Sequence, residues 1–168
     1  HTESLVENLL RLQGFASEDI QYQGSYEPLI KSLLPSKRTG KNASGKPEIV
    51  YRLNGDANDL LVIECKNEQI FHASSAVEKA TNLETVALDA VDYAEDGVIH
   101  YMRGLRKQFN VIGLAISGVD RDTVRITEFM CLREGPITRL AATTILKPEQ
   151  YLSILGAAEE PPIAAADI

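Results

Sequence analysis

Two acidic residues and a lysine are expected to meet at one end of a β-hairpin. Residues 46–67 hold two apolar stretches joined by a cluster of turn-forming residues, which predicts two paired strands. Glu64 and Lys66 lie on the same side of the second strand, about 6.6 Å apart at ~3.3 Å per residue. Glu48 lies at the start of the first strand. This arrangement suits a divalent metal ion and an activated water.

The chemistry that fits these residues is hydrolysis of a phosphodiester. The reaction needs a nucleophilic water, charge compensation at phosphorus and help for the leaving oxygen, and Mg²⁺ held by carboxylates supplies most of this. Mg²⁺ takes hard oxygen ligands and keeps several waters, so two acids and one backbone carbonyl suffice. In this hypothesis Glu48, Glu64 and the carbonyl of Cys65 are the ligands. The Lys66 ammonium would orient the attacking water or help to deprotonate it.

The elements that must position these residues follow from hydrophobic periodicity. Helices are expected at residues 2–13, 25–34, 74–93, 98–109 and 148–155. The hairpin at 47–66 and two further apolar runs at 111–116 and 124–132 supply the strands. Asp96 and Gly97 are expected to separate the third helix from the fourth. This order predicts an α/β fold in which helices flank a mixed sheet.

Length and composition predict one globular domain in a reducing compartment. The chain has 168 residues, of which 44% are hydrophobic, enough for one domain with its own core. Its two cysteines, Cys65 and Cys131, argue against a disulfide framework or a cysteine-rich metal site, so a cytoplasmic setting is expected. No apolar run approaches the ~20 residues that span a bilayer, and no membrane partner is expected.

The net charge of −7 argues against a protein that coats nucleic acid without specificity. Two groups of basic residues would nevertheless suit phosphate, and the alternative is that both are solvated surfaces. The groups are Lys31, Lys37, Arg38, Lys41 and Lys46 before the hairpin, and Arg103, Arg106 and Lys107 on a later helix.

The hairpin resembles the core motif of a nuclease superfamily. The pair Pro47-Glu48, fifteen intervening residues and the run Glu64-Cys65-Lys66 are similar to the PD-(D/E)xK signature. The surrounding sequence is similar to the N-terminal nuclease modules of type I restriction subunits and of fused restriction–methylation enzymes. The resemblance implies a restriction-endonuclease-like fold with a four-stranded mixed sheet, Mg²⁺ or Mn²⁺ as cofactor, and double-stranded DNA as substrate.

The resemblance spans about residues 2–132 and departs from the family pattern in two places. The usual first acid is Asp, and Glu48 is one methylene longer. Some relatives carry Gln-x-x-x-Tyr on a helix after the lysine. Residues 97–101 keep its tyrosine, Tyr101, and lack the glutamine.

Residues on two expected helices are further candidates for the site. His100, Arg103 and Lys107 share a helix face and would approach DNA. Some members of the superfamily add an acid from the first helix, for which Glu3 and Glu7 are the candidates. The alternative is that both are exposed acids, which the helix dipole favours near an N-terminus.

Other residue types offer no competing site. His72 is expected at the surface after the second strand, and Ser117 lacks a paired base that would indicate a hydrolase triad. The sequence has no phosphate-binding Gly-Lys-Ser/Thr loop, so any use of ATP would belong to another domain.

These expectations combine into two hypotheses. In the first, residues 1–155 form a Mg²⁺-dependent DNA endonuclease module, and residues 156–168 link it to a downstream domain of a restriction–modification protein. Glu48, Glu64 and Lys66 are then its catalytic residues. Other domains or subunits, and a second copy on the DNA, are its partners. In the second hypothesis, the chain is a nuclease-fold scaffold that binds or assembles without cutting.

Overall fold

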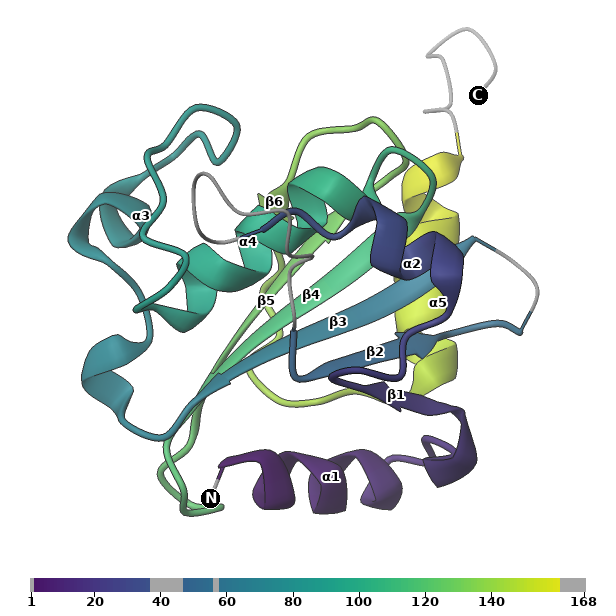
Figure 1. Ribbon diagram of the computed structural model, residues 1–168, viewed down its shortest axis with the longest axis horizontal. Helices are drawn as coiled ribbons and strands as arrows, with labels where there is room; N and C mark the ends of the chain where they lie inside the picture. The colour runs from purple at the N-terminus through teal and green to yellow at the C-terminus, as the bar shows by residue number, and fades with distance from the viewer. Residues whose placement is uncertain (1, 37–46, 56–57, 161–168) are drawn as a thin grey trace, which may run out of the picture.

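The computed structural model describes residues 2–36, 47–55 and 58–160, and a mixed sheet forms its centre (Figure 1). Within these residues the sheet has six strands in the order β1-β2-β3-β4-β5-β6. Neighbouring strands are antiparallel except β3 and β4, which are parallel. The strands are β1 (Ile20–Tyr22), β2 (Ile49–Arg52), β3 (Asp59–Lys66), β4 (Asn110–Ser117), β5 (Arg125–Cys131) and β6 (Thr138–Arg139).

The helices of the described residues cover both faces of the sheet. They are α1 (Thr2–Leu12), α2 (Pro28–Leu33), α3 (Ser75–Lys79), α4 (Ala94–Leu105) and α5 (Pro148–Glu159). Helices α2, α3 and α4 pack on one face, where α4 lies over β3 and β4. Helices α1 and α5 pack on the other, and α5 passes behind the strands in Figure 1. We call these the α4 face and the α5 face.

The hairpin that carries the predicted motif is confirmed as β2 and β3. Ile49 pairs with Ile63 in antiparallel register. Along β3, Val62 packs into the core on the α4 face and Ile63 into the core on the α5 face. Because side chains alternate, Glu64 and Lys66 continue the row on the α4 face. Burial on both faces explains why the sequence of β3 is continuously apolar up to this point.

The predicted mixed sheet with flanking helices is confirmed, but the sheet has six strands rather than four. Strands β2 to β5 are the four that were expected. The additional strands β1 and β6 lie at the two edges and have three and two residues. Such short segments cannot show the alternation from which a strand is predicted.

The Ala-rich segment 74–93 is not the continuous helix that its sequence predicts. Only the five residues of α3 are helical within it. Two arginines from distant elements bind backbone carbonyls of this segment, and these bonds satisfy acceptors that a helix would otherwise use. Arg139 and Arg103 donate to the carbonyls of Val77, Ala80, Leu83 and Val86.

Helix α4 begins earlier than the helix predicted at 98–109 and contains the expected breakers Asp96 and Gly97. Asp96 is fully buried, and its carboxylate accepts hydrogen bonds from Ser74 and from the Asp89 N–H at 2.6–3.0 Å. These bonds tie the preceding loop to the first turn of the helix, where an acidic residue is favoured.

The remaining predicted helices are confirmed with shifted ends. Helix α5 runs to Glu159, so residues 156–159 of the segment expected to be a linker are helical. The basic loop expected before the hairpin falls mainly at 37–46, outside the described residues. No helix in the part of the chain that the structure describes has the length and apolar character needed to cross a membrane.

Candidate active site

The two predicted metal-binding glutamates lie together where β2 enters the sheet. The Glu48 N–H donates to the Ile63 carbonyl at 3.0 Å, just before the first ladder pair of Ile49 with Ile63. This bond holds Glu48 beside Glu64 on the neighbouring strand. Glu64 is only 2% exposed, whereas Glu48 is partly exposed. Solvent therefore reaches the pair at Glu48, whereas Glu64 is shielded from it.

The charges of both glutamates act on the same two neighbours. Burial raises the pKa of the Tyr26 hydroxyl, and the carboxylates of Glu48 and Glu64 raise it further. Burial and the same two carboxylates also raise the pKa of the Cys65 thiol. The two acids thus share one electrostatic environment. Two carboxylates on neighbouring strands repel each other, and a bound cation would relieve that repulsion.

The Cys65 carbonyl faces the edge of β3 at which Glu48 lies. Backbone groups of alternate residues point to the same edge of a strand. The Ile63 carbonyl accepts a hydrogen bond from β2, and the Lys66 carbonyl accepts one from the β4 side. The Cys65 carbonyl lies two residues after that of Ile63 and therefore also points toward β2. The next residue outward on the β2 side is Pro47, which has no N–H to donate. The Cys65 thiol is buried on the α5 face, so a ligand from this residue would be its carbonyl oxygen.

Lys66 lies on the α4 face with Glu64, as its spacing predicts. Its ammonium donates a hydrogen bond to the Val91 carbonyl, in the loop before α4, at 2.8 Å. Its own carbonyl accepts from the Thr2 hydroxyl at 3.1 Å and from the Gly118 N–H at 3.0 Å. These contacts fix the end of β3 and keep the ammonium on the side of the sheet where Glu64 lies.

Helix α4 approaches Glu64 through a glycine. A Cβ atom at Gly97 would lie 3.0 Å from Glu64 Oε2 and 3.2 Å from the Ala90 carbonyl oxygen. Gly97 is the position at which the resemblance would place glutamine, and a side chain there requires Glu64 to shift. The backbone of α4 at Gly97 therefore lies close against the Glu64 carboxylate.

A buried histidine on the same face of the sheet, between α4 and strands β4 and β5, was not predicted. His72, expected at the surface, is 0% exposed. Its Nδ1 lies 2.7 Å from Ser117 Oγ. Its Nε2 lies 2.8 Å from Thr127 Oγ1 and 3.2 Å from Glu95 Oε2. Ser117 and Thr127 are polar residues on the α4 face of β4 and β5, and a polar group that is buried there needs a partner.

Glu95, in the first turn of α4, completes this cluster. Burial acts to raise its pKa, but hydrogen bonds from His72 and Thr127 and the charge of Arg139 outweigh burial, and the pKa is lowered. Ser117 is fully buried, so its contact with His72 is closed to any substrate. The expectation that Ser117 has no paired base is wrong, because His72 lies within hydrogen-bond distance of its hydroxyl. The cluster anchors the start of α4 rather than forming a hydrolase triad.

The basic residues and the histidine expected on the helix predicted at 98–109 are mostly engaged inside the molecule. His100 Nε2 lies 2.8 Å from a backbone carbonyl, and Arg103 donates to two loop carbonyls at 2.8 and 3.2 Å. Arg106 pairs with Glu84 at 2.7 Å. Lys107 is exposed. The structure therefore assigns His100 and Arg103 to internal contacts and leaves Lys107 at the surface.

Glu3 and Glu7 lie on α1, which packs on the α5 face, away from Glu64. Glu3 is exposed, and its charge adds least among the causes that raise the pKa of Cys65. Glu7 lies 3.7 Å from Arg11 one helical turn later. Both fit the alternative of helix-surface acids.

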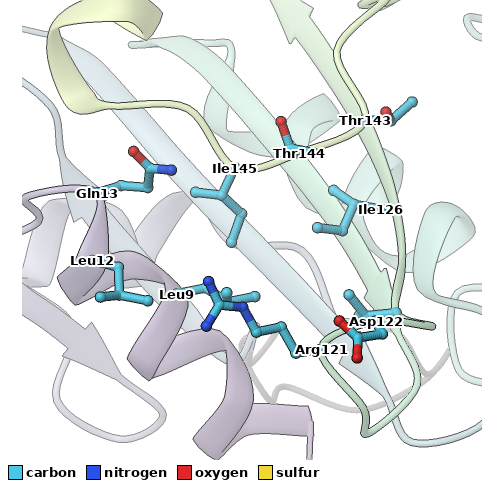
Figure 2. A pocket seen from close by; sticks show the side chains of 10 residues that line it. Leu9, Leu12, Gln13, Arg121, Asp122, Ile126, Thr143, Thr144 and Ile145 are labelled. Atoms are coloured by element: carbon cyan, nitrogen blue, oxygen red, sulfur yellow. The ribbon is translucent and has the colours of Figure 1, made fainter.

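A hollow of about 400 Å³ lies on the α5 face, between the end of α1 and the loop before α5 (Figure 2). Leu9, Ile126 and Ile145 form much of its lining, and Arg121 reaches toward it from the turn between β4 and β5. The sheet separates this hollow from Glu64. It therefore contributes nothing to the candidate site.

The donor set at the hairpin consists of oxygen atoms, which hard divalent metal ions prefer. Among the described residues no three Asp, Glu, His or Cys side chains are grouped as a metal site. Two carboxylates and one carbonyl, completed by waters, suit Mg²⁺, which commonly keeps part of its hydration shell.

Comparison of the chain with protein-family models, with curated proteins and with solved structures gives no match.

Proposed function

We propose that this chain is a Mg²⁺-dependent DNA endonuclease module of the PD-(D/E)xK type. One observation carries the proposal: Glu48, Glu64 and Lys66 gather at one end of the hairpin. The Cys65 carbonyl faces the same edge. Two acids, a backbone oxygen and an amine are the groups that metal-assisted hydrolysis of a phosphodiester needs.

Each residue has a separate role in this proposal. Glu48, Glu64 and the Cys65 carbonyl hold the ion. When bound, a divalent ion supplies charge compensation at phosphorus and lowers the pKa of a water molecule. The Lys66 ammonium, placed by the Val91 carbonyl, orients the attacking water and offsets phosphate charge.

Substrate and partners follow from the family resemblance. The substrate is double-stranded DNA, and the module works with other domains or subunits of a restriction–modification protein in the cytoplasm. The net charge of −7 fits a module that a larger DNA-binding partner brings to its substrate. Cutting both strands takes two such sites, so the proposal includes a dimer on the DNA.

A scaffold that no longer cuts is the second candidate, and two observations favour it. The Lys66 ammonium donates to a backbone carbonyl, that of Val91. The residue at position 48 is glutamate, whose carboxylate lies one methylene farther from the strand than that of aspartate. A scaffold of this kind would bind DNA or a protein partner without affinity for Mg²⁺.

Plasmid cleavage in Mg²⁺ or Mn²⁺ separates the two candidates. The full-length wild-type protein is compared with Lys66→Ala and with Lys79→Ala, which removes an exposed lysine on α3. We expect Lys66→Ala to lower the cleavage rate by about 10²–10⁴-fold, the usual contribution of a group that moves or positions a proton. Lys79→Ala should cut like the wild type. Undiminished cutting by Lys66→Ala would refute the assignment, and wild-type protein that binds DNA without cutting it would favour the scaffold.

A further inference from the structure

We propose that Tyr26 is a positioning residue for the acid pair: its hydrogen bond to the Pro47 carbonyl holds Glu48 beside Glu64. The inference rests on the proposed function and adds a residue that the motif does not contain. Tyr26 lies just before α2, more than twenty positions upstream of Glu48. It is partly buried and packs against the core of the α4 face.

The contacts of Tyr26 and its neighbour hold β2 at both of its ends. The Tyr26 hydroxyl donates to the carbonyl of Pro47, next to Glu48. The adjacent carboxylate of Glu27 accepts two hydrogen bonds from the Arg52 guanidinium, at 2.6 and 2.8 Å, at the other end of the strand. A two-point attachment of this kind fixes both the direction and the level at which β2 enters the sheet.

The sheet pairs β2 from Ile49 onward, with Ile63 of β3 on one side and Tyr22 of β1 on the other, so a bond to Pro47 adds an attachment before the paired residues begin. The ladder with β3 begins at Ile49, and the Glu48 N–H makes one further bond to it. Pro47 has no N–H and adds no ladder bond. The peptide that joins Pro47 to Glu48 is thus bound at both of its polar groups: its N–H donates to Ile63, and its carbonyl accepts from Tyr26. Without the bond from Tyr26, this peptide keeps only the bond to Ile63, and the Glu48 carboxylate is held less firmly beside Glu64.

The charge environment is consistent with this role. Burial and the carboxylates of Glu48 and Glu64 raise the pKa of the Tyr26 hydroxyl well above its ordinary value. The hydroxyl therefore keeps its proton near neutral pH and remains a donor to the Pro47 carbonyl. The same influence shows that Tyr26 lies near both acids.

A Mn²⁺ titration of full-length protein, followed by electron paramagnetic resonance, tests the inference. The variants are Tyr26→Phe, which keeps the ring and removes the hydroxyl, and Tyr22→Phe, a matched control at an exposed tyrosine of β1. We expect Tyr26→Phe to weaken Mn²⁺ binding by about tenfold, the lower end of what outer-shell partners of a metal contribute. Raised Mg²⁺ should restore its cleavage, and Tyr22→Phe should match the wild type.

A second readout uses the wild-type protein. In NMR of tyrosine-labelled protein, the signal of Tyr26, identified by its loss in Tyr26→Phe, should shift as Mg²⁺ is added, and that of Tyr22 should stay in place. Mn²⁺ affinity in Tyr26→Phe equal to that of the wild type, with no Mg²⁺-dependent shift, would overturn the positioning role alone. Wild-type protein that binds no Mn²⁺ would overturn the proposed function with it.

Discussion

Two buried glutamates, one on each face of the sheet, differ in their surroundings. Glu64 on β3 faces α4, with Glu48 beside it and Lys66 two residues away on the same face. Glu128 on β5 is 0% exposed, and its Oε1 accepts a hydrogen bond from the Tyr151 hydroxyl of α5. Its Oε2 has no partner among the described residues. Burial is common to both, and the groups nearby are what distinguish a candidate site from an isolated acid.

Glu128, the isolated acid, has a raised pKa because it is buried. Burial raises the pKa of Glu128 to about 7, and the hydrogen bond from Tyr151 lowers it only in part. The carboxyl group therefore gains a proton near neutrality and no longer needs a counter-charge. Glu64 has a second acid beside it and a lysine on the same face, and both glutamates raise the pKa of Tyr26. In the proposed function, a cation would therefore bind at the pair and not at Glu128.

Exchanging each acid for its amide gives the largest expected contrast. Glu64→Gln should lower the rate of plasmid cleavage by about 10³-fold, because a catalytic metal is worth several kcal/mol and each ~1.4 kcal/mol is tenfold in rate. Glu128→Gln should cut at the wild-type rate. Equal losses in both variants would mean that the two acids do not differ as we describe.

The buried cluster next to the candidate site is expected to matter for stability. His72→Ala removes the partner of Ser117 and Thr127 and leaves the Glu95 carboxylate buried with less compensation, which should cost about 3–5 kcal/mol in the free energy of unfolding. Urea denaturation measures this loss. His100→Ala, which removes one partly exposed hydrogen bond, should cost only about 1 kcal/mol. A cost for His72→Ala no larger than that for His100→Ala would contradict the anchoring role.

The raised pKa of Glu128 predicts a dependence of stability on pH. In the folded state the carboxyl binds a proton up to about pH 7, whereas in the unfolded state it loses the proton near its ordinary pKa of 4.5. The folded protein therefore binds more protons in this window, and stability falls as pH rises through it. The fall should be about 3–4 kcal/mol, since the pKa rises by about 2.5 units and one unit is worth about 1.4 kcal/mol. Glu128→Gln should remove this part of the slope in urea titrations at a series of pH values, and an unchanged slope would show that the group does not titrate there.

The smallest expected effect separates two helical glycines. A Cβ at Gly156 in α5 meets nothing within 4 Å, so Gly156→Ala should raise stability by about 0.5–1 kcal/mol through helix propensity. At Gly97 the same gain is offset because the Cβ crowds Glu64 Oε2 at 3.0 Å. Gly97→Ala should leave stability near that of the wild type and weaken Mn²⁺ binding several-fold. Equal stabilisation in both variants, with unchanged metal binding, would argue against close contact between α4 and the acid.

The parts of the molecule that were predicted correctly depend on local pattern. The apolar runs of β3 and β4 and the spacing of Glu64 and Lys66 are properties of a few neighbouring residues, and all of them are confirmed. The helix expected at 74–93 is wrong, and in the observed structure carbonyls of this segment accept hydrogen bonds from Arg103 and Arg139, far along the chain. The hydrophobic periodicity of a segment cannot predict hydrogen bonds that it forms with residues far away in the sequence.

The candidate site shows the same division. The motif residues could be named from their spacing, but the contacts that hold them could not. Tyr26 reaches the hairpin from an upstream segment, and His72 meets partners from α4, β4 and β5. A solitary histidine or tyrosine in the sequence carries no sign of which distant group it will contact.

Binding of Mn²⁺ to the wild-type protein, Glu64→Gln and Glu128→Gln tests the central claim most directly. If the Glu48–Glu64 pair is a metal site, the wild type and Glu128→Gln bind Mn²⁺ with the same affinity and stoichiometry, and Glu64→Gln loses that binding. If Glu64→Gln binds Mn²⁺ as the wild type does, the acid pair at the end of the hairpin is not the metal site and the nuclease assignment fails.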